Sequence, residues 1–408
     1  MDRLSLSPED RLILLCARTR MAEDVRHEVI KLLNSSLDWD YILSSATRHG
    51  VSPLLYRNLS AIDIGGDDMP EEIITKLREQ FYKNIARNML LYNELSKVLK
   101  AFTDAGLDVI VLKGAVLAET VYKNIGLRAI GDVDLLVKKA DLDRAKKELA
   151  LLGYNPLQCD LTQWHADQGR LLTHMHLTPY CKQGLSIEVH WDLQTLASPF
   201  RIDINAFWHN AQPVTIADVD ALMLAPEDLL QHLCLHLDQH LRSGAIPLRW
   251  YCDIAEVIEQ YDEKINWNYL VRQSKNHGIE EPMYQGVYIV SNYFGCFVPA
   301  HVLHDLKPAN VDCDDIDDLF RRLIGGKIKK GKEGMGYFRM ITKVDGIVNK
   351  AHLLFDAVFP CKEYMIRRYS IKNKKLIYVY YLTRFGTVLR SGLNVLWYVL
   401  RYPFKELL

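Results

Sequence analysis

The stretch GDVDLLV, residues 131–137, decides how the chain is interpreted, because it places two carboxylates one residue apart before an apolar run. Side chains alternate along a strand with a period of two, so Asp132 and Asp134 are expected on the same face. Two like charges at the head of a buried strand have two explanations. Either a turn ends there in water, or a cation binds between the two carboxylates.

Apolar runs on both sides of this stretch predict further elements. A β-branched run at 107–112 (LDVIVL) predicts a buried strand, and residues 185–193 (LSIEVHWDL) alternate cleanly, as a strand does. Helices are expected at 115–122 and 140–154. The order strand, helix, strand, helix, strand predicts a small α+β core with a mixed sheet.

Amphipathic helical patterns flank this core. They predict an N-terminal helical module at 1–100, the core at 101–220, and a C-terminal helical module with a basic tail at 221–408. The tail holds an apolar stretch of ten residues between Arg390 and Arg401. A bilayer requires roughly 20 residues, so no transmembrane span is expected.

The net charge of −1 hides an asymmetry. From residue 319 onward there are 19 Lys and Arg against 5 Asp and Glu, a balance of +14 that leaves −15 on the first 318 residues. An anionic partner would suit this basic third: RNA, a phosphorylated ligand or a membrane surface. Neutralisation of the acidic remainder of the chain is an equal alternative.

The start of the chain and its cysteines bear on the compartment. The first 20 residues are charged throughout and show no secretory signal, and the eight cysteines form no CxxC pair. We therefore expect a cytoplasmic protein with reduced thiols. Peripheral attachment to a membrane through residues 385–408 is the alternative.

A third acidic position is predicted on the 185–193 strand, where Glu188, His190 and Asp192 share one face. Carboxylate clusters select hard cations such as Mg²⁺, and two such ions can stabilise the attacking and leaving oxygens of a phosphoryl transfer. We expect Asp132, Asp134 and Glu188 to bind two Mg²⁺ ions.

The junction at Lys113-Gly114 suits phosphate chemistry. A turn that leads into a helix offers backbone N–H groups to a triphosphate. Lys113 and Arg128 supply cationic contacts for phosphate oxygens.

Taken together, these motifs resemble the nucleotidyltransferase superfamily of DNA-polymerase-β-like fold, whose hallmark is a glycine turn followed by Asp-x-Asp and a third acidic strand. More narrowly, the chain resembles the bacterial family of uncharacterised nucleotidyltransferases. The resemblance is carried by LKGAVLAETVY, GLRAIGDVDLLV, AKKELALLGY and IEVHWDL, and it continues into LHLDQHLRSGAIPLRWYCDIAEVI.

The resemblance implies a magnesium-dependent enzyme that moves a nucleoside monophosphate from an NTP, such as ATP, to an unidentified acceptor and releases pyrophosphate. It implies that Asp132, Asp134 and Glu188 are the catalytic metal ligands. The nucleotide-binding residues that it implies are Lys113, Gly114, Ala115, Arg128 and His190.

Two departures from the superfamily pattern leave alternatives open. The turn is Lys-Gly-Ala where Gly-Ser or Gly-Gly is usual, and Glu188 stands where Asp is common. One alternative is a catalytically weak or silent binding module in a biosynthetic assembly. Another is a toxin-like enzyme that adds nucleotides to RNA, which the basic C-terminal third would serve.

Three further motifs have simpler interpretations. His232, His236 and His240 fall at i, i+4 and i+8 of one helix, a span of about 12 Å that is too long for one zinc ion, so we expect them to face the catalytic core. Residues 325–336 carry a glutamate where a phosphate-binding P-loop needs Ser or Thr, which predicts a basic surface loop. Arg249 and Asp253 are expected to form a buried Arg–Asp clamp between helices.

Overall fold

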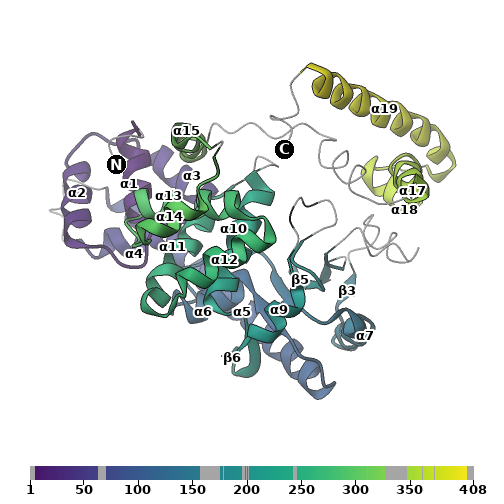
Figure 1. Ribbon diagram of the computed structural model, residues 1–408, viewed down its shortest axis with the longest axis horizontal. Coiled ribbons are helices and arrows are strands. Elements are labelled where there is room, and N and C mark those ends of the chain that lie inside the picture. The colour runs from purple at the N-terminus through teal and green to yellow at the C-terminus, as the bar shows by residue number, and fades with distance from the viewer. Residues whose placement is uncertain are drawn as a thin grey trace. The chain divides into compact units, whose positions relative to one another are not determined.

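A computed structural model of the chain describes residues 5–62, 70–156, 175–177, 179–194, 198, 200, 202–241, 246–309, 311–326, 347–360, 362–371 and 373–401. These residues belong to two compact units (Figure 1). The first comprises Met1–Leu135 and Asp203–Lys330, and the second comprises Leu136–Ile202 and Gly331–Leu408. The three modules expected from the sequence stay a prediction.

The first unit begins with helices. They are α1 (Pro8–Cys16), α2 (Glu23–Leu33), α3 (Trp39–His49), α4 (Ser52–Ser60) and the 34-residue α5 (Glu71–Asp104). Ser7 and Asp38 cap α1 and α3 with their side-chain oxygens, and Gly50 ends α3 in the left-handed conformation. Helix α1 packs on α2, α3 and α4, and α4 packs on α5.

The strands of this unit form both kinds of pairing. Strand β1 (Ile110–Leu112) runs parallel to β7 (Val219–Met223), and β7 pairs antiparallel with β6 (Gln212–Ile216). Along the chain of this unit, β1 is followed by α6 (Lys113–Thr120), the start of β2 (Val133–Leu136) and α9 (Ile204–Asn210), and then by β6 and β7. The sheet is therefore mixed, as predicted, but the hairpin of β6 and β7 was not expected.

The remaining helices of the first unit are α10 (Pro226–Leu241), α11 (Arg249–Tyr261), α12 (Trp267–His277), α13 (Glu280–Tyr293), α14 (Ala300–Leu306) and α15 (Cys313–Ile324). Helix α10 packs against α11, α12 and α13, which lie beside it in Figure 1. Eleven of its sixteen residues are buried, so α10 is the central helix of this core.

The second unit contains the end of β2, then α7 (Leu142–Leu151) and the antiparallel strands β3 (Asn155–Pro156), β4 (Tyr180–Lys182) and β5 (Leu185–His190). The backbone N–H of Val137, just after β2, donates to the carbonyl of His190 at 2.9 Å. The chain thus passes from one unit to the other within β2. The sequence predicted that this strand extends to residue 193, but β5 ends at His190.

The C-terminal part of the second unit is helical, with α17 (Ile347–Val358), α18 (Lys362–Arg368) and α19 (Ile377–Arg401). A small core of Met365, Ile371 and Ile377 holds α18 and α19 together. Among the described helices, none has the length and apolar character needed to cross a membrane. Most of the predicted 325–336 loop, from residue 327 onward, lies outside the described residues.

Taken together, the α+β class predicted from the sequence is confirmed, with a mixed sheet and flanking helices. Six cysteines of the described chain form no disulfide: Cys16, Cys181, Cys234, Cys252, Cys296 and Cys313.

His49 joins distant parts of the first unit. Its Nε2 lies 3.0 Å from the carbonyl of Ile324, and its Nδ1 accepts from the N–H of Leu248 at 3.2 Å. Both contacts require a neutral ring that carries its proton on Nε2. Burial lowers the pKa of His49 to about 4, although the Ile324 carbonyl opposes this shift.

We predict that the chain loses stability on mild acidification because of His49. Between its usual value of 6.5 and about 4, the unfolded histidine binds a proton that the folded one does not. The contribution is intact above pH 6.5 and falls by about 3 kcal/mol as the pH drops to 4. Urea unfolding at pH 7 and pH 5 should show a smaller difference in His49→Gln than in the parent. The exposed control His301→Gln should match the parent, and an unchanged difference in His49→Gln would contradict the prediction.

Candidate active site

Lys113 stands at the junction of β1 and α6. Its backbone φ is +47°, so the chain turns from strand to helix at this residue. Its Nζ lies 2.9 Å from Oδ1 of Asp134. The lysine side chain is 17% exposed and that of Asp134 is 4% exposed, so water screens this pair poorly. The structure thus brings together two of the predicted site residues.

Asp132 precedes β2 and is half-buried. Burial raises the pKa of Asp132, the neighbouring charge of Asp134 raises it further, and Lys113, Arg128 and Arg249 oppose the rise. The carboxylate therefore faces one like charge and three cations. A divalent cation would relieve the repulsion between the two aspartates.

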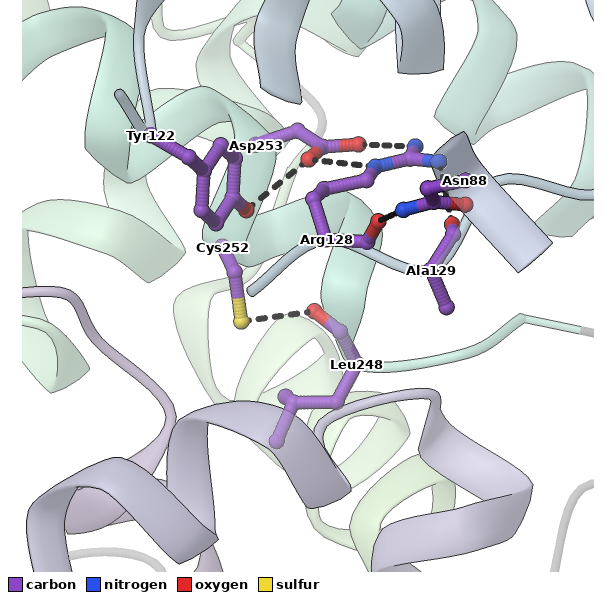
Figure 2. A network of polar contacts seen from close by, with 7 residues as sticks. All are labelled: Asn88, Tyr122, Arg128, Ala129, Leu248, Cys252 and Asp253. Carbon is purple, nitrogen blue, oxygen red and sulfur yellow. Dashed lines mark hydrogen bonds and ion pairs between the residues drawn. The ribbon is translucent and has the colours of Figure 1, made fainter. Parts of the chain in front are cut away.

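Arg128 is held in a buried network (Figure 2). Its Nε and Nη2 donate to Asp253 of α11 at 3.2 and 2.6 Å, and its Nη1 donates to the Ala129 carbonyl at 2.7 Å. The hydroxyl of Tyr122 donates to the same Asp253 at 2.9 Å. The expected clamp at Asp253 exists, but its arginine is Arg128, one of the predicted phosphate contacts, and not the expected Arg249.

Gly114 makes room for this arginine. A Cβ at Gly114 would lie 2.7 Å from Nη1 of Arg128, closer than a carbon atom can approach without displacing the guanidinium. The next residue, Ala115, is anchored through its carbonyl, which accepts from the Tyr92 hydroxyl. The first turn of α6 is therefore fixed between α5 and the Arg128–Asp253 pair.

We predict that Asp253→Asn strongly destabilises the chain. The variant removes the negative charge that pairs with the buried Arg128 guanidinium. Breaking a buried ion pair in this way costs about 3–5 kcal/mol. The matched control is Asp318→Asn, because Asp318 pairs with Arg321 and Arg322 at the surface, where such pairs contribute about 0–1 kcal/mol. Chemical denaturation compares the two, and equal losses would contradict the buried clamp.

The histidines of α10 face this region. The rings of His236 and His240 lie 4.5 Å apart, and each is 4.6 Å from the ring of Trp250. Burial lowers the pKa of His236 well below its usual value and also lowers that of His240, with Lys113 adding to both shifts and Asp134 opposing them. These rings are therefore neutral near pH 7. Their coupling to Lys113 and Asp134 supports the expectation that they face the core.

In the second unit, β5 positions Glu188 and His190. His190 Nε2 lies 3.7 Å from Glu188 Oε2, and the side chains are 1% and 22% exposed. The ring of His176 packs 5.0 Å from that of His190. Asp192, predicted on the same face, instead accepts the backbone N–H groups of Leu193 and Gln194.

Some residues of this region were not singled out from the sequence. Tyr122, Trp250 and Asn88 each contact a predicted site residue or its partner; Asn88 donates to the Arg128 carbonyl at 2.9 Å (Figure 2). A tyrosine, a tryptophan or an asparagine in a helical pattern has no distinctive spacing. These contacts become visible only when the helices are folded.

The chain thus has an α+β core with a carboxylate pair at the head of β2. The model of the family described as uncharacterised nucleotidyltransferase matches residues 35–295, and the chain belongs to this family. No curated protein matches the chain, and no solved structure does either. Nucleotidyl transfer is therefore the general activity to which the family points.

The described residues include donors for a divalent metal. Asp134, Glu188 and His190 carry carboxylate and imidazole atoms that could hold a metal ion. Carboxylate oxygens suit Mg²⁺ and Mn²⁺, and the imidazole widens the choice to transition metals. This donor chemistry fits the metal expected for such an enzyme.

Proposed function

We propose that the chain transfers a nucleoside monophosphate from an NTP to an acceptor and releases pyrophosphate, with Mg²⁺ as its metal. The observation that carries the proposal is the buried Lys113–Asp134 pair at the strand-to-helix junction, with Asp132 beside it. Buried carboxylates that repel each other next to a helix N-terminus suit a metal-bound triphosphate.

In this proposal Asp132, Asp134 and Glu188 hold the metal, with His190 beside them. Support comes from the continuity of the chain. Val137 is bonded through its N–H to the carbonyl of His190. Because a strand rises about 3.3 Å per residue, Asp134 lies within about 10 Å of Val137 along the same strand. Two Mg²⁺ ions would supply charge stabilisation for the attacking and leaving oxygens.

Lys113 has two partners in this proposal. While no metal is bound to Asp134, the ammonium group of Lys113, 2.9 Å from its Oδ1, neutralises the carboxylate. If Asp134 held a metal instead, the ammonium group of Lys113 would become available to a phosphate oxygen of the incoming NTP. The buried carboxylate of Asp134 would thus be paired with a cation in either state, with Lys113 before the metal binds and with the metal afterwards, which avoids an isolated buried charge.

Arg128, Gly114 and Ala115 position the phosphate turn. The guanidinium is already bound to Asp253, so its proposed role is to fix the first turn of α6, where Gly114 lies against it. The backbone N–H groups of that turn would then face the triphosphate. Glu188, or one of the two aspartates, would accept the proton of the acceptor hydroxyl.

We predict that Asp132→Asn abolishes magnesium-dependent NTP binding while the fold persists, because the amide keeps the shape and loses the charge. Isothermal titration with non-hydrolysable analogues of each NTP, in Mg²⁺ and in EDTA, measures this. The control Asp104→Asn removes an exposed carboxylate at the end of α5 and should bind as the parent does. Undiminished binding by Asp132→Asn would overturn the proposed metal site.

We also predict opposite effects of Lys113→Gln on two ligands. Without the competing ammonium, Mn²⁺ alone should bind more tightly, because Asp134 no longer has to leave a buried ion pair. NTP with Mg²⁺ should bind about tenfold more weakly, since a charged phosphate contact is lost. Manganese titration followed by electron paramagnetic resonance gives the first quantity and calorimetry gives the second. A parallel change in both affinities would contradict the exchange of partners.

A further inference from the structure

A cavity of about 490 Å³ lies within the first unit, and neither Asp132 nor Asp134 lines it. Its walls come from the segment between α1 and α2, from the start of α2, from α4, from α11, from residues 121–123, which follow α6, and from residues 294–296, which follow α13. Helix α6 begins at Lys113, and residues 121–123 come directly after its last residue. A helix of this length spans about 12 Å. The cavity is therefore at the opposite end of α6 from the proposed triphosphate turn.

Cations predominate among the side chains of this cavity that are free to bind a ligand. Four line it: Arg18, Arg20, Arg57 and Lys123. Three acidic residues also line it: Asp24, Glu256 and Glu259. Glu256 is already engaged, because it accepts from the backbone N–H of Thr19 at 2.7 Å and from the Thr19 hydroxyl.

Arg18 is the group that points to a ligand. Its Nε and Nη2 atoms are buried, and neither has a hydrogen-bond acceptor among the described residues. Its backbone is fixed, since the carbonyl of Arg18 accepts from Asn58 at 2.8 Å and the next residue is bound to Glu256. A buried guanidinium edge with two N–H groups and no acceptor is a costly arrangement unless a ligand completes it.

A smaller hollow of about 380 Å³ continues the same surface. It shares Arg57, Tyr122 and Lys123 with the larger cavity and adds the aromatic side chains of Tyr56 and Phe81. An anionic group at Arg18 could therefore be joined to an uncharged part that lies over these rings. Arg57 and Lys123 border both spaces.

We propose that this cavity is a second anion site, which binds the phosphate group of a small phosphorylated molecule. The Nε and Nη2 edge of Arg18 matches two oxygens of one phosphate, as in forked arginine contacts. The added charges of Arg57 and Lys123 favour a doubly charged phosphate over a singly charged carboxylate. The site does not depend on the proposed transfer reaction, because it uses none of its residues.

The test uses the full chain carrying Asp132→Asn, in EDTA, so that the triphosphate site stays silent. Inorganic phosphate is titrated at constant ionic strength and followed by ³¹P line broadening, with sodium acetate as the carboxylate comparison in a parallel titration followed by ¹H line broadening. We expect saturable phosphate binding, weaker acetate binding, and at least a tenfold loss of phosphate affinity in Arg18→Gln.

Two further variants complete the test. Arg57→Gln removes an exposed cation of the cavity and should weaken phosphate binding several-fold, which keeps the test valid even if Arg18→Gln fails to fold. Arg272→Gln removes an exposed arginine of α12 outside the cavity and should leave binding unchanged. Non-saturable binding, equal affinity for acetate, or affinities unaffected by both Arg18→Gln and Arg57→Gln would overturn the proposal.

Discussion

The buried ion pair between Arg128 and Asp253 is the interaction on which the candidate site depends. It joins the segment before β2 to α11, and both partners are nearly inaccessible, at 7% and 1% exposure. Tyr122 and Asn88 bind the same network from two other directions. Because a buried charge must stay paired, the helices can hardly shift relative to the turn at Lys113. The rigidity that the proposed phosphate recognition would need thus arises from an ion pair that is itself shielded from water.

The class of fold could be predicted from the sequence, and the carboxylates Asp132 and Asp134 could be singled out as site candidates, because both rest on local patterns. Asp132 and Asp134 stand out by spacing alone, and the strands beside them are short apolar runs. The hairpin of β6 and β7 was missed for a local reason. Its turn consists of Ala217 and Asp218, both with positive φ, so it lacks the Asn-Gly or Gly signal that usually marks such turns.

The electrostatics of the site could not be predicted in the same way. Arg128 and Asp253 are 125 residues apart in the chain, and no spacing rule connects them. The sequence suggested Arg128 as a phosphate ligand because a cation near an acidic motif is available in principle. Whether that cation is free depends on which helix packs over it. The same holds for His236, whose position on α10 was clear but whose neutrality follows from burial beside Lys113.

The contacts of the N-terminal helices also constrain how the chain can be made. Thr19 is bound to Glu256, 237 residues later, and His49 contacts Ile324, 275 residues later. At synthesis rates of 5–20 residues per second, these partners leave the ribosome roughly 12–55 s after the helices that need them. Until then, these polar groups of the N-terminal segment lack their final partners. A chaperone that shields nascent chains would be most useful to this protein during that interval.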